Sequence, residues 1–211
     1  MVTFFGSDLN EQDRPMTTTT RIRAQFEASS ALQLACAELL SPAISSSAEL
    51  LVATFLMEKK VLVCGNGGSV ALAQYFTACM LHRFDLDRPG LAAISLCSDS
   101  VTLTAIAKDM QFEQVFSKQV QALGQASDVL LVISFSGNSS NSLGAIRAAH
   151  DRGMRVIAMT GGDGGELMEL LQEQDIHIGV PHENSARVQE VNLLTLHALC
   201  DAIDSLLLGV E

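Results

Sequence analysis

The sequence predicts an α/β fold, a three-layer doubly wound parallel sheet with a helical extension before it. After Lys60, five short apolar runs alternate with longer segments, which is typical of buried parallel strands joined by crossover helices. Loops rich in glycine or serine follow the first, third and fourth runs. Parallel strands of an open sheet end at one edge, where such loops meet helix N-termini. We therefore expect a ligand site at that edge.

The predicted strands share a short length and a mainly apolar composition. They cover Val61–Cys64, Leu91–Leu96, Val129–Ile133, Arg155–Met159 and Ile176–Val180. The segments between the strands are long enough for crossover helices. These segments begin at Ser69, Ser100, Ser140 and Gly165, and a final long helix covers Ser185–Leu208.

The N-terminal part divides into a leader and a helical extension. Residues 1–19 combine acids, Gly, Pro and a threonine run, and this composition offers too little apolar surface to pack. We predict a flexible leader over residues 1–19 and a single domain over residues 20–211, because a chain of this length suits one α/β domain. Between residues 20 and 58 apolar residues recur at helical spacing, and Pro42 predicts a break between two helices.

Composition excludes several classes of partner. The formal charge of −11 repels phosphate backbones, so we expect no direct nucleic-acid contact. No run approaches the roughly 18 apolar residues of a membrane span, and the N-terminus lacks a secretory signal. The five cysteines include no CxxC pair, which favours reduced core thiols. These features predict a cytoplasmic protein that makes no membrane contact.

Two loops carry the pattern of an anion site. Residues 64–69 read CGNGGS, directly after a strand and before a helix, where backbone N–H groups can bind phosphate. A tight turn capped by Ser69 is the alternative. Residues 134–141 read SFSGNSSN and supply four hydroxyls, more than one helix cap needs, so a site for a phosphate group is favoured over two turns. We interpret the third loop, residues 160–165, as structural, because its glycines serve mainly to permit unusual backbone angles.

With these loops the sequence resembles the SIS-domain family, and within it the phosphoheptose isomerase group, from about residue 21 to residue 208. The motifs that carry the resemblance are CGNGGS at 64–69, RP at 88–89, LTAIAKD at 103–109, SGNS at 136–139 and ARVQEVNLLTLHALCDAID at 186–204.

The resemblance implies a set of sugar-phosphate ligands. These are Asn66, Gly67, Gly68, Ser69, Arg83, Asp109, Ser134, Ser136, Ser139 and Gln189. For Arg83 a surface ion pair with Asp85 or Asp87 is the alternative. The resemblance also assigns Gln189 and His197 to the family's remaining catalytic positions, and simple packing of His197 in an apolar helix is the alternative.

The group contains two kinds of protein, which individual residues must separate. One kind isomerises sedoheptulose 7-phosphate, and the other, the DnaA initiator-associating protein, binds the replication initiator as a homotetramer. In the isomerases the helix after GNGGS carries a His and, four residues later, a Glu, as metal ligand and acid/base group. This sequence has Tyr75 and Cys79 there, and neither replaces those groups easily near neutral pH.

We therefore expect a non-catalytic or weakly catalytic phosphosugar-binding protein similar to the DnaA initiator-associating protein, with DnaA as a candidate partner. The resemblance implies a homotetramer, and we expect no cofactor. The alternative is a sedoheptulose 7-phosphate isomerase of heptose biosynthesis, in which zinc would be expected. A regulator that senses a sugar phosphate and binds another partner is a third interpretation.

Overall fold

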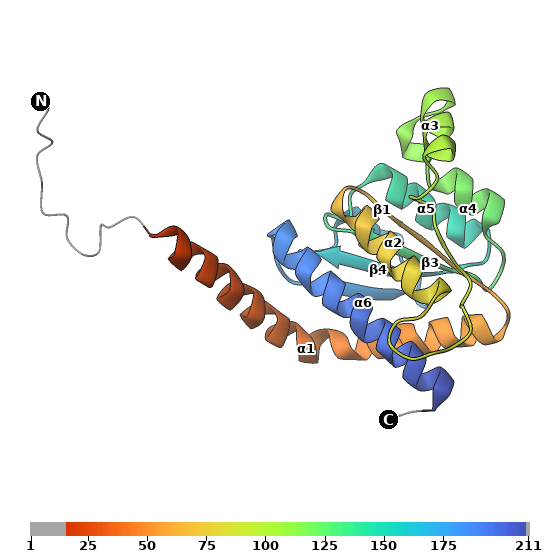
Figure 1. Cartoon of the computed structure of the whole chain (residues 1–211). Helices are drawn as coiled ribbons and strands as arrows, with labels where there is room; N and C mark the ends of the chain where they lie inside the picture. The colour runs from red at the N-terminus through yellow and green to blue at the C-terminus, as the bar shows by residue number, and fades with distance from the viewer. Residues whose placement is uncertain (1–15, 210–211) are drawn as a thin grey trace, which may run out of the picture.

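The computed structural model describes residues 16–209, so the predicted leader lies outside the described residues up to residue 15. Five parallel strands form one sheet in the order β2-β1-β3-β4-β5 (Figure 1). The strands are β1 (Val61–Gly65), β2 (Ala93–Ser95), β3 (Val129–Ser134), β4 (Arg155–Gly161) and β5 (Ile176–Val180). The predicted fold class is confirmed, and the change of direction in strand order falls between β1 and β3.

Helices cover both faces of this sheet and complete the three layers. They are α1 (Thr18–Leu56), α2 (Gly68–Leu81), α3 (Ser100–Asp109), α4 (Ser117–Leu123), α5 (Ser140–Asp151) and α6 (Ser185–Leu208), with the short 3-10 helices η2 (Phe112–Gln114) and η3 (Gly165–Glu169). Helices α2 and α6 pack together on one face, α4 and α5 pack on the other, and α1 lies against α6 and β5 (Figure 1). Every residue of β1 and β3 is buried, which explains their almost unbroken apolar sequences.

The helical extension is one helix, so the predicted break at Pro42 is wrong. Helix α1 continues through Pro42 and bends partway along its length (Figure 1). Proline removes one backbone N–H and crowds the preceding turn, which bends a helix without always ending it. Thr17, within the predicted leader, caps this helix by accepting a hydrogen bond from the backbone N–H of Thr20.

Two other expectations need correction. The segment beginning at Gly165 forms a short 3-10 helix in place of a crossover helix, because Gly162, Gly164 and Gly165 all have positive φ and fold it into turns. Strand β2 is shorter than expected, since the backbone N–H of Leu91 donates to the carbonyl of Met80 at the end of α2 and not to the sheet.

Helices α1 and α6 are long and apolar enough to cross a membrane by length and composition. The position of α6 explains its apolar composition otherwise, because α6 packs against α1, α2 and the sheet, with nearly half of its apolar window buried. All five cysteines are buried and free, as predicted. Helix α6 therefore serves as a packing element of the domain, whereas only 28 % of the apolar window of α1 is buried.

Candidate functional site

The two predicted loops meet at the switch point of the sheet. In the sheet register Gly65, the last residue of β1, pairs with Ile133 near the end of β3. The loops that follow these strands lead into α2 and α5, whose N-termini therefore open at the same edge. Open α/β sheets bind ligands in this crevice, because backbone N–H groups from both helix N-termini face it.

The first loop needs glycine at two positions for different reasons. A Cβ at Gly65 would lie 2.8 Å from the carbonyl oxygen of Ile133 and 2.7 Å from Cβ of Ser69. Gly67 has φ +55°, a conformation that residues with a side chain rarely adopt, and open space surrounds it. Ser69 is buried beneath the loop. The sequence CGNGGS thus fixes a tight turn whose exposed backbone at Gly67 and Gly68 remains accessible.

The second loop is held by the glycine-rich segment after β4. A Cβ at Gly137, where φ is +65°, would lie 1.8 Å from the carbonyl oxygen of Gly164. The Oδ1 atom of Asn138 accepts a hydrogen bond from the backbone N–H of Glu166 at 2.8 Å. The third loop, residues 160–165, therefore supports the second, which agrees with its predicted structural role.

The serines of the second loop differ in their surroundings. Ser134 is buried at the end of β3, whereas the exposed Ser136 accepts a hydrogen bond from the backbone N–H of Asn138 through its Oγ atom at 3.2 Å. Ser139 occupies the N-cap of α5, yet its side chain makes no capping hydrogen bond. The Ser139 hydroxyl is therefore free of the usual capping role and can serve a ligand.

A pair of asparagine side chains joins the two loops. The Nδ2 atom of Asn66 donates to Oδ1 of Asn141 at 2.8 Å, and Nδ2 of Asn141 donates to Oδ1 of Asn66 at 3.0 Å. Asn141 is buried at the start of α5, and Asn66 is partly exposed. The predicted ligand residue Asn66 therefore has half of its hydrogen-bonding capacity already used.

An open pocket of about 440 Å³ lies over this pair. It is lined by Asn66, Gly67, Phe112, Glu113, Ser139, Ser140 and Asn141. Phe112 and Glu113 come from η2, and the sequence analysis did not assign them a role. No motif marks them, because only the packing of η2 against α5 brings them to the pocket.

A second group of predicted residues lies where α2 and α6 run side by side. A Cβ at Gly68 would lie 2.3 Å from Nε2 of Gln189, so the Gln189 amide covers the start of α2. Further along, the ring centroids of Tyr75 and His197 are 5.5 Å apart in an edge-on arrangement. The His197 ring also lies 5.6 Å from the ring of Phe84. Gln189 and His197 thus lie on the seam between the two helices, with Tyr75 facing His197.

Tyr75 and Cys79, which stand where the isomerases have His and Glu, lie on this same seam. Burial, followed by a hydrogen bond with Cys79, raises the pKa of the Tyr75 phenol, so the phenol stays protonated at neutral pH. Cys79 is buried, and burial together with the nearby Cys79 also raises the pKa of the Cys200 thiol. The Tyr75 phenol is consequently neutral, so it offers a hydrogen-bond donor and no base.

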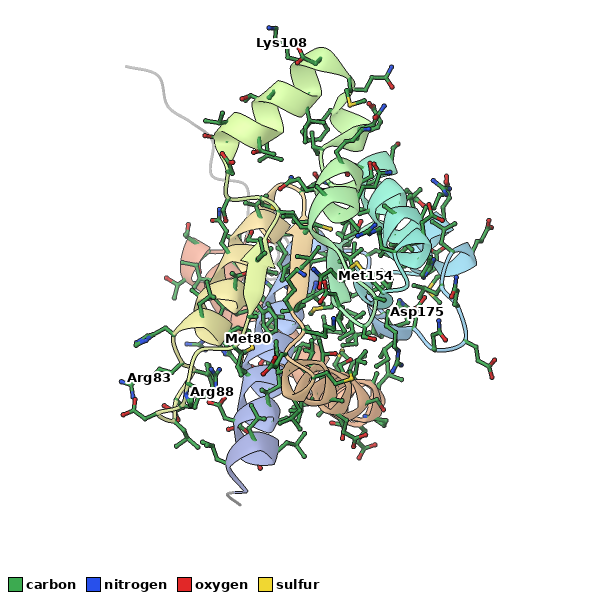
Figure 2. The ribbon with its side chains drawn as sticks, turned by 90° about the vertical axis from the view of Figure 1, so that its right-hand side faces the viewer. Met80, Arg83, Arg88, Lys108, Met154 and Asp175 are labelled. Atoms are coloured by element: carbon green, nitrogen blue, oxygen red, sulfur yellow. The ribbon has the colours of Figure 1, made fainter. Side chains whose placement is uncertain are left out.

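Two predicted ligands lie away from the pocket. The Nη1 atom of Arg83 pairs with Oδ1 of Asp87 at 3.1 Å on the surface, which is the arrangement given above as the alternative. Asp109 ends α3, where no residue is buried, and its side chain is 73 % exposed beside Lys108. Figure 2 shows Lys108 at the far end of this projecting helix, well away from Arg83 and Arg88.

Metal chemistry does not fit the residues that line the seam. Zinc prefers several thiolate, imidazole or carboxylate ligands at one point. Within residues 16–209 no three His, Cys, Asp or Glu side chains form such a group. Cys79, Gln189 and His197 supply one thiol, one amide and one imidazole, which falls short of the three or four thiolate, imidazole or carboxylate ligands of a protein zinc site.

Comparison with known proteins identifies the class to which this fold and site belong. The SIS domain family model matches residues 25–161, and the chain is a member of that family. A phosphoheptose isomerase from Azoarcus sp. (strain BH72) is 54 % identical over 196 residues, which cover 93 % of this chain and 100 % of the relative. The chain therefore belongs to the phosphoheptose isomerase group of the SIS-domain family.

Solved structures give the same placement. Phosphoheptose isomerase GmhA from Neisseria gonorrhoeae has a TM-score of 0.85 and 45 % identity, covering 90 % of this chain and all of that chain. A phosphoheptose isomerase from Francisella tularensis has a TM-score of 0.87 and 45 % identity with the same coverage. The relatives support an enzyme of the sugar-phosphate isomerase class.

These comparisons correct the main functional expectation. A binding protein similar to the DnaA initiator-associating protein was expected because Tyr75 and Cys79 replace the His and Glu of the isomerases. Relatives that match nearly the whole chain are instead phosphoheptose isomerases, which favours the alternative. The expectation gave two positions on one helix more weight than the similarity of the whole chain.

Proposed function

We propose that the protein is a sedoheptulose 7-phosphate isomerase, an aldose–ketose isomerase acting on a phosphorylated heptose. The observation that carries the proposal is the 54 % identity with a phosphoheptose isomerase over the whole length of that relative. The pocket at the switch point adds chemical support, because two helix N-termini and free hydroxyl and amide groups suit an anionic, polyhydroxylated ligand.

The phosphate would bind at the helix N-termini without a buried cation. Backbone N–H groups at Gly67 and Gly68 and the uncommitted hydroxyl of Ser139 are donors at the same edge. Donors of this kind bind a phosphomonoester through hydrogen bonds and helix dipoles. The predicted ligands Ser69 and Ser134 are buried at the start of α2 and the end of β3, so the exposed groups of the two loops are the first to meet a ligand.

The reaction moves protons between neighbouring atoms of the sugar. A base removes a proton from the carbon beside the carbonyl, and the electron pair shifts to give an enediolate. The proton then returns to the neighbouring carbon while a hydroxyl proton moves to the other oxygen, so no oxidant is needed. Proton transfer by a positioned group accelerates such a step by roughly 10² to 10⁴-fold.

His197 is the group on the α2–α6 seam that can accept and return this proton. It is partly exposed, and the Tyr75 and Phe84 rings hold its imidazole in place. The protonated Tyr75 phenol beside it can donate a hydrogen bond to the developing enediolate oxygen. Gln189, whose amide covers the start of α2, is positioned to orient the substrate.

The test is an assay of sedoheptulose 7-phosphate turnover by the wild type and by His197→Ala. We expect measurable wild-type turnover and a loss of roughly 10² to 10⁴-fold in the variant, with sugar-phosphate binding retained. His82→Ala is the matched control, since His82 is exposed at the end of α2, and it should leave the rate unchanged. Absence of wild-type turnover would overturn the reaction, and an unaffected His197→Ala enzyme would overturn the role of His197.

We further propose that the enzyme is a homotetramer that acts in the cytoplasm. Ile22, Phe26 and Leu34 on the first half of α1 are 54 %, 73 % and 76 % exposed, and such an apolar surface is unfavourable in water. Light scattering should give about four chain masses. A monomer at micromolar concentration would contradict this assembly.

A further inference from the structure

We propose that Asn141 is a positioning residue, which holds the Asn66 amide in the orientation that the ligand needs. The inference rests on the sugar-phosphate site proposed above and assigns a role within it to a residue that does not itself have to touch the ligand. Asn141 is 3 % exposed, so its side chain is almost wholly engaged inside the protein.

The two hydrogen bonds define the direction of both amides. Each amide has two N–H donors and one oxygen acceptor, and the reciprocal pair uses one donor and one oxygen lone pair of each. Turning either amide by 180° would place donor against donor and acceptor against acceptor. The partly exposed Asn66 is therefore left with one N–H and one acceptor site in fixed directions.

The pair also links the two halves of the site. Asn66 follows β1, and Asn141 lies in the first turn of α5 after β3. Among residues 16–209 these are the side-chain hydrogen bonds that connect residues 66–69 with residues 134–142. Both asparagines line the open pocket, so the link lies at the surface where a ligand would bind.

A positioning role of Asn141 and a purely stabilising role predict different effects on ligand affinity. A residue that only stabilises the fold would lower the melting temperature, and its removal would add to the effect of removing Asn66. A residue that acts through Asn66 has no further effect on ligand affinity once the Asn66 amide is gone. A double-mutant cycle read out by binding therefore separates the two roles.

The experiment titrates five proteins with sedoheptulose 7-phosphate by calorimetry: wild type, Asn66→Ala, Asn141→Ala, the double variant and Ser142→Ala. We expect each asparagine variant to bind about tenfold more weakly and the double variant to match Asn66→Ala. Ser142→Ala is the matched control, because Ser142 is the next residue of α5 and its buried Oγ has no hydrogen-bond partner in the described chain. Its affinity should equal that of the wild type.

Several outcomes would overturn the inference: unchanged affinity in either single variant, or a double variant whose loss is the product of the two single losses. If Asn141→Ala fails to fold, Asn141→Leu enters the same cycle, because it keeps a similar side-chain shape and removes both hydrogen bonds to Asn66 without adding a charge. Turnover is measured separately. A wild type that binds without turnover would refute the isomerase and leave the cycle readable, whereas a wild type that binds neither sedoheptulose 7-phosphate nor inorganic phosphate would refute both.

Discussion

Replacing Gly137 by alanine tests whether the glycine-rich loop after β4 holds the serine loop in place. At φ +65° an alanine is strained by about 1–2 kcal/mol. Its Cβ would also lie 1.8 Å from the carbonyl oxygen of Gly164, which is backbone and cannot rotate away. Such overpacking costs about 1–3 kcal/mol more. Together these terms give a loss of about 2–5 kcal/mol, a large part of the roughly 5–15 kcal/mol that stabilises a domain.

The measurement is chemical denaturation of Gly137→Ala beside Gly209→Ala. Gly209 has nearly the same φ, +64°, but no atom lies within 4 Å of a Cβ built there. This control should lose only the strain of about 1–2 kcal/mol. Sugar-phosphate affinity should fall in Gly137→Ala and stay unchanged in Gly209→Ala. Equal losses of stability in the two variants would refute the argument from packing.

Three further predictions concern charge. Arg88→Met should lower the free energy of unfolding by about 3–5 kcal/mol in denaturant titrations, because it leaves the buried Asp204 carboxylate unpaired. Adding Asp204→Asn to this variant should recover part of the lost stability. Glu113→Gln should tighten sugar-phosphate binding about two- to fivefold, because it removes a negative charge from the pocket. Glu27→Gln on α1 should leave the affinity unchanged, and equal effects of the two variants would refute a local effect of the Glu113 charge. Burial lowers the pKa of His177 below its ordinary value of 6.5, so its contribution to stability is present above pH 6.5 and is lost as the pH falls through the folded-state pKa. The free energy of unfolding of His177→Gln should therefore fall less than that of the wild type between pH 7 and 5. Parallel plots of this free energy against pH would contradict the prediction.

The parallel sheet could be predicted from the sequence, because buried parallel strands need continuous apolar runs. Strand β5 and helix α6 have the predicted bounds, and both lie between clear turn residues. Pro42 was misleading, since a proline can bend a helix without ending it when residues before and after the proline are buried against the rest of the protein. Gly165 was misleading in the opposite way, because successive positive φ angles prevented a helix that the segment length allowed.

The site was predictable where local sequence determines it and not where packing does. The loops at residues 66–69 and 134–141 follow from strand, glycine and hydroxyl patterns alone. Glu113 and the partnership of Asn66 with Asn141 depend on how η2 and α5 dock, which no local pattern records. Two histidines illustrate the same limit: Nε2 of His150 lies 2.8 Å from Oδ2 of Asp175, and Nε2 of His177 lies 2.7 Å from Oγ1 of Thr160, contacts between separate segments that no local pattern records.

The arrangement of α6 has a consequence for the order in which the protein can become active. Its residues Gln189 and His197 complete a seam whose other half, α2, is more than a hundred positions earlier in the chain. It also packs against α1, so the first and last helices meet. Contacts between such distant segments form slowly, because a long loop must close before they stabilise the fold. During synthesis the loops at residues 66–69 and 134–141 can therefore assemble early, whereas the seam between α2 and α6 forms only once α6 has been synthesised.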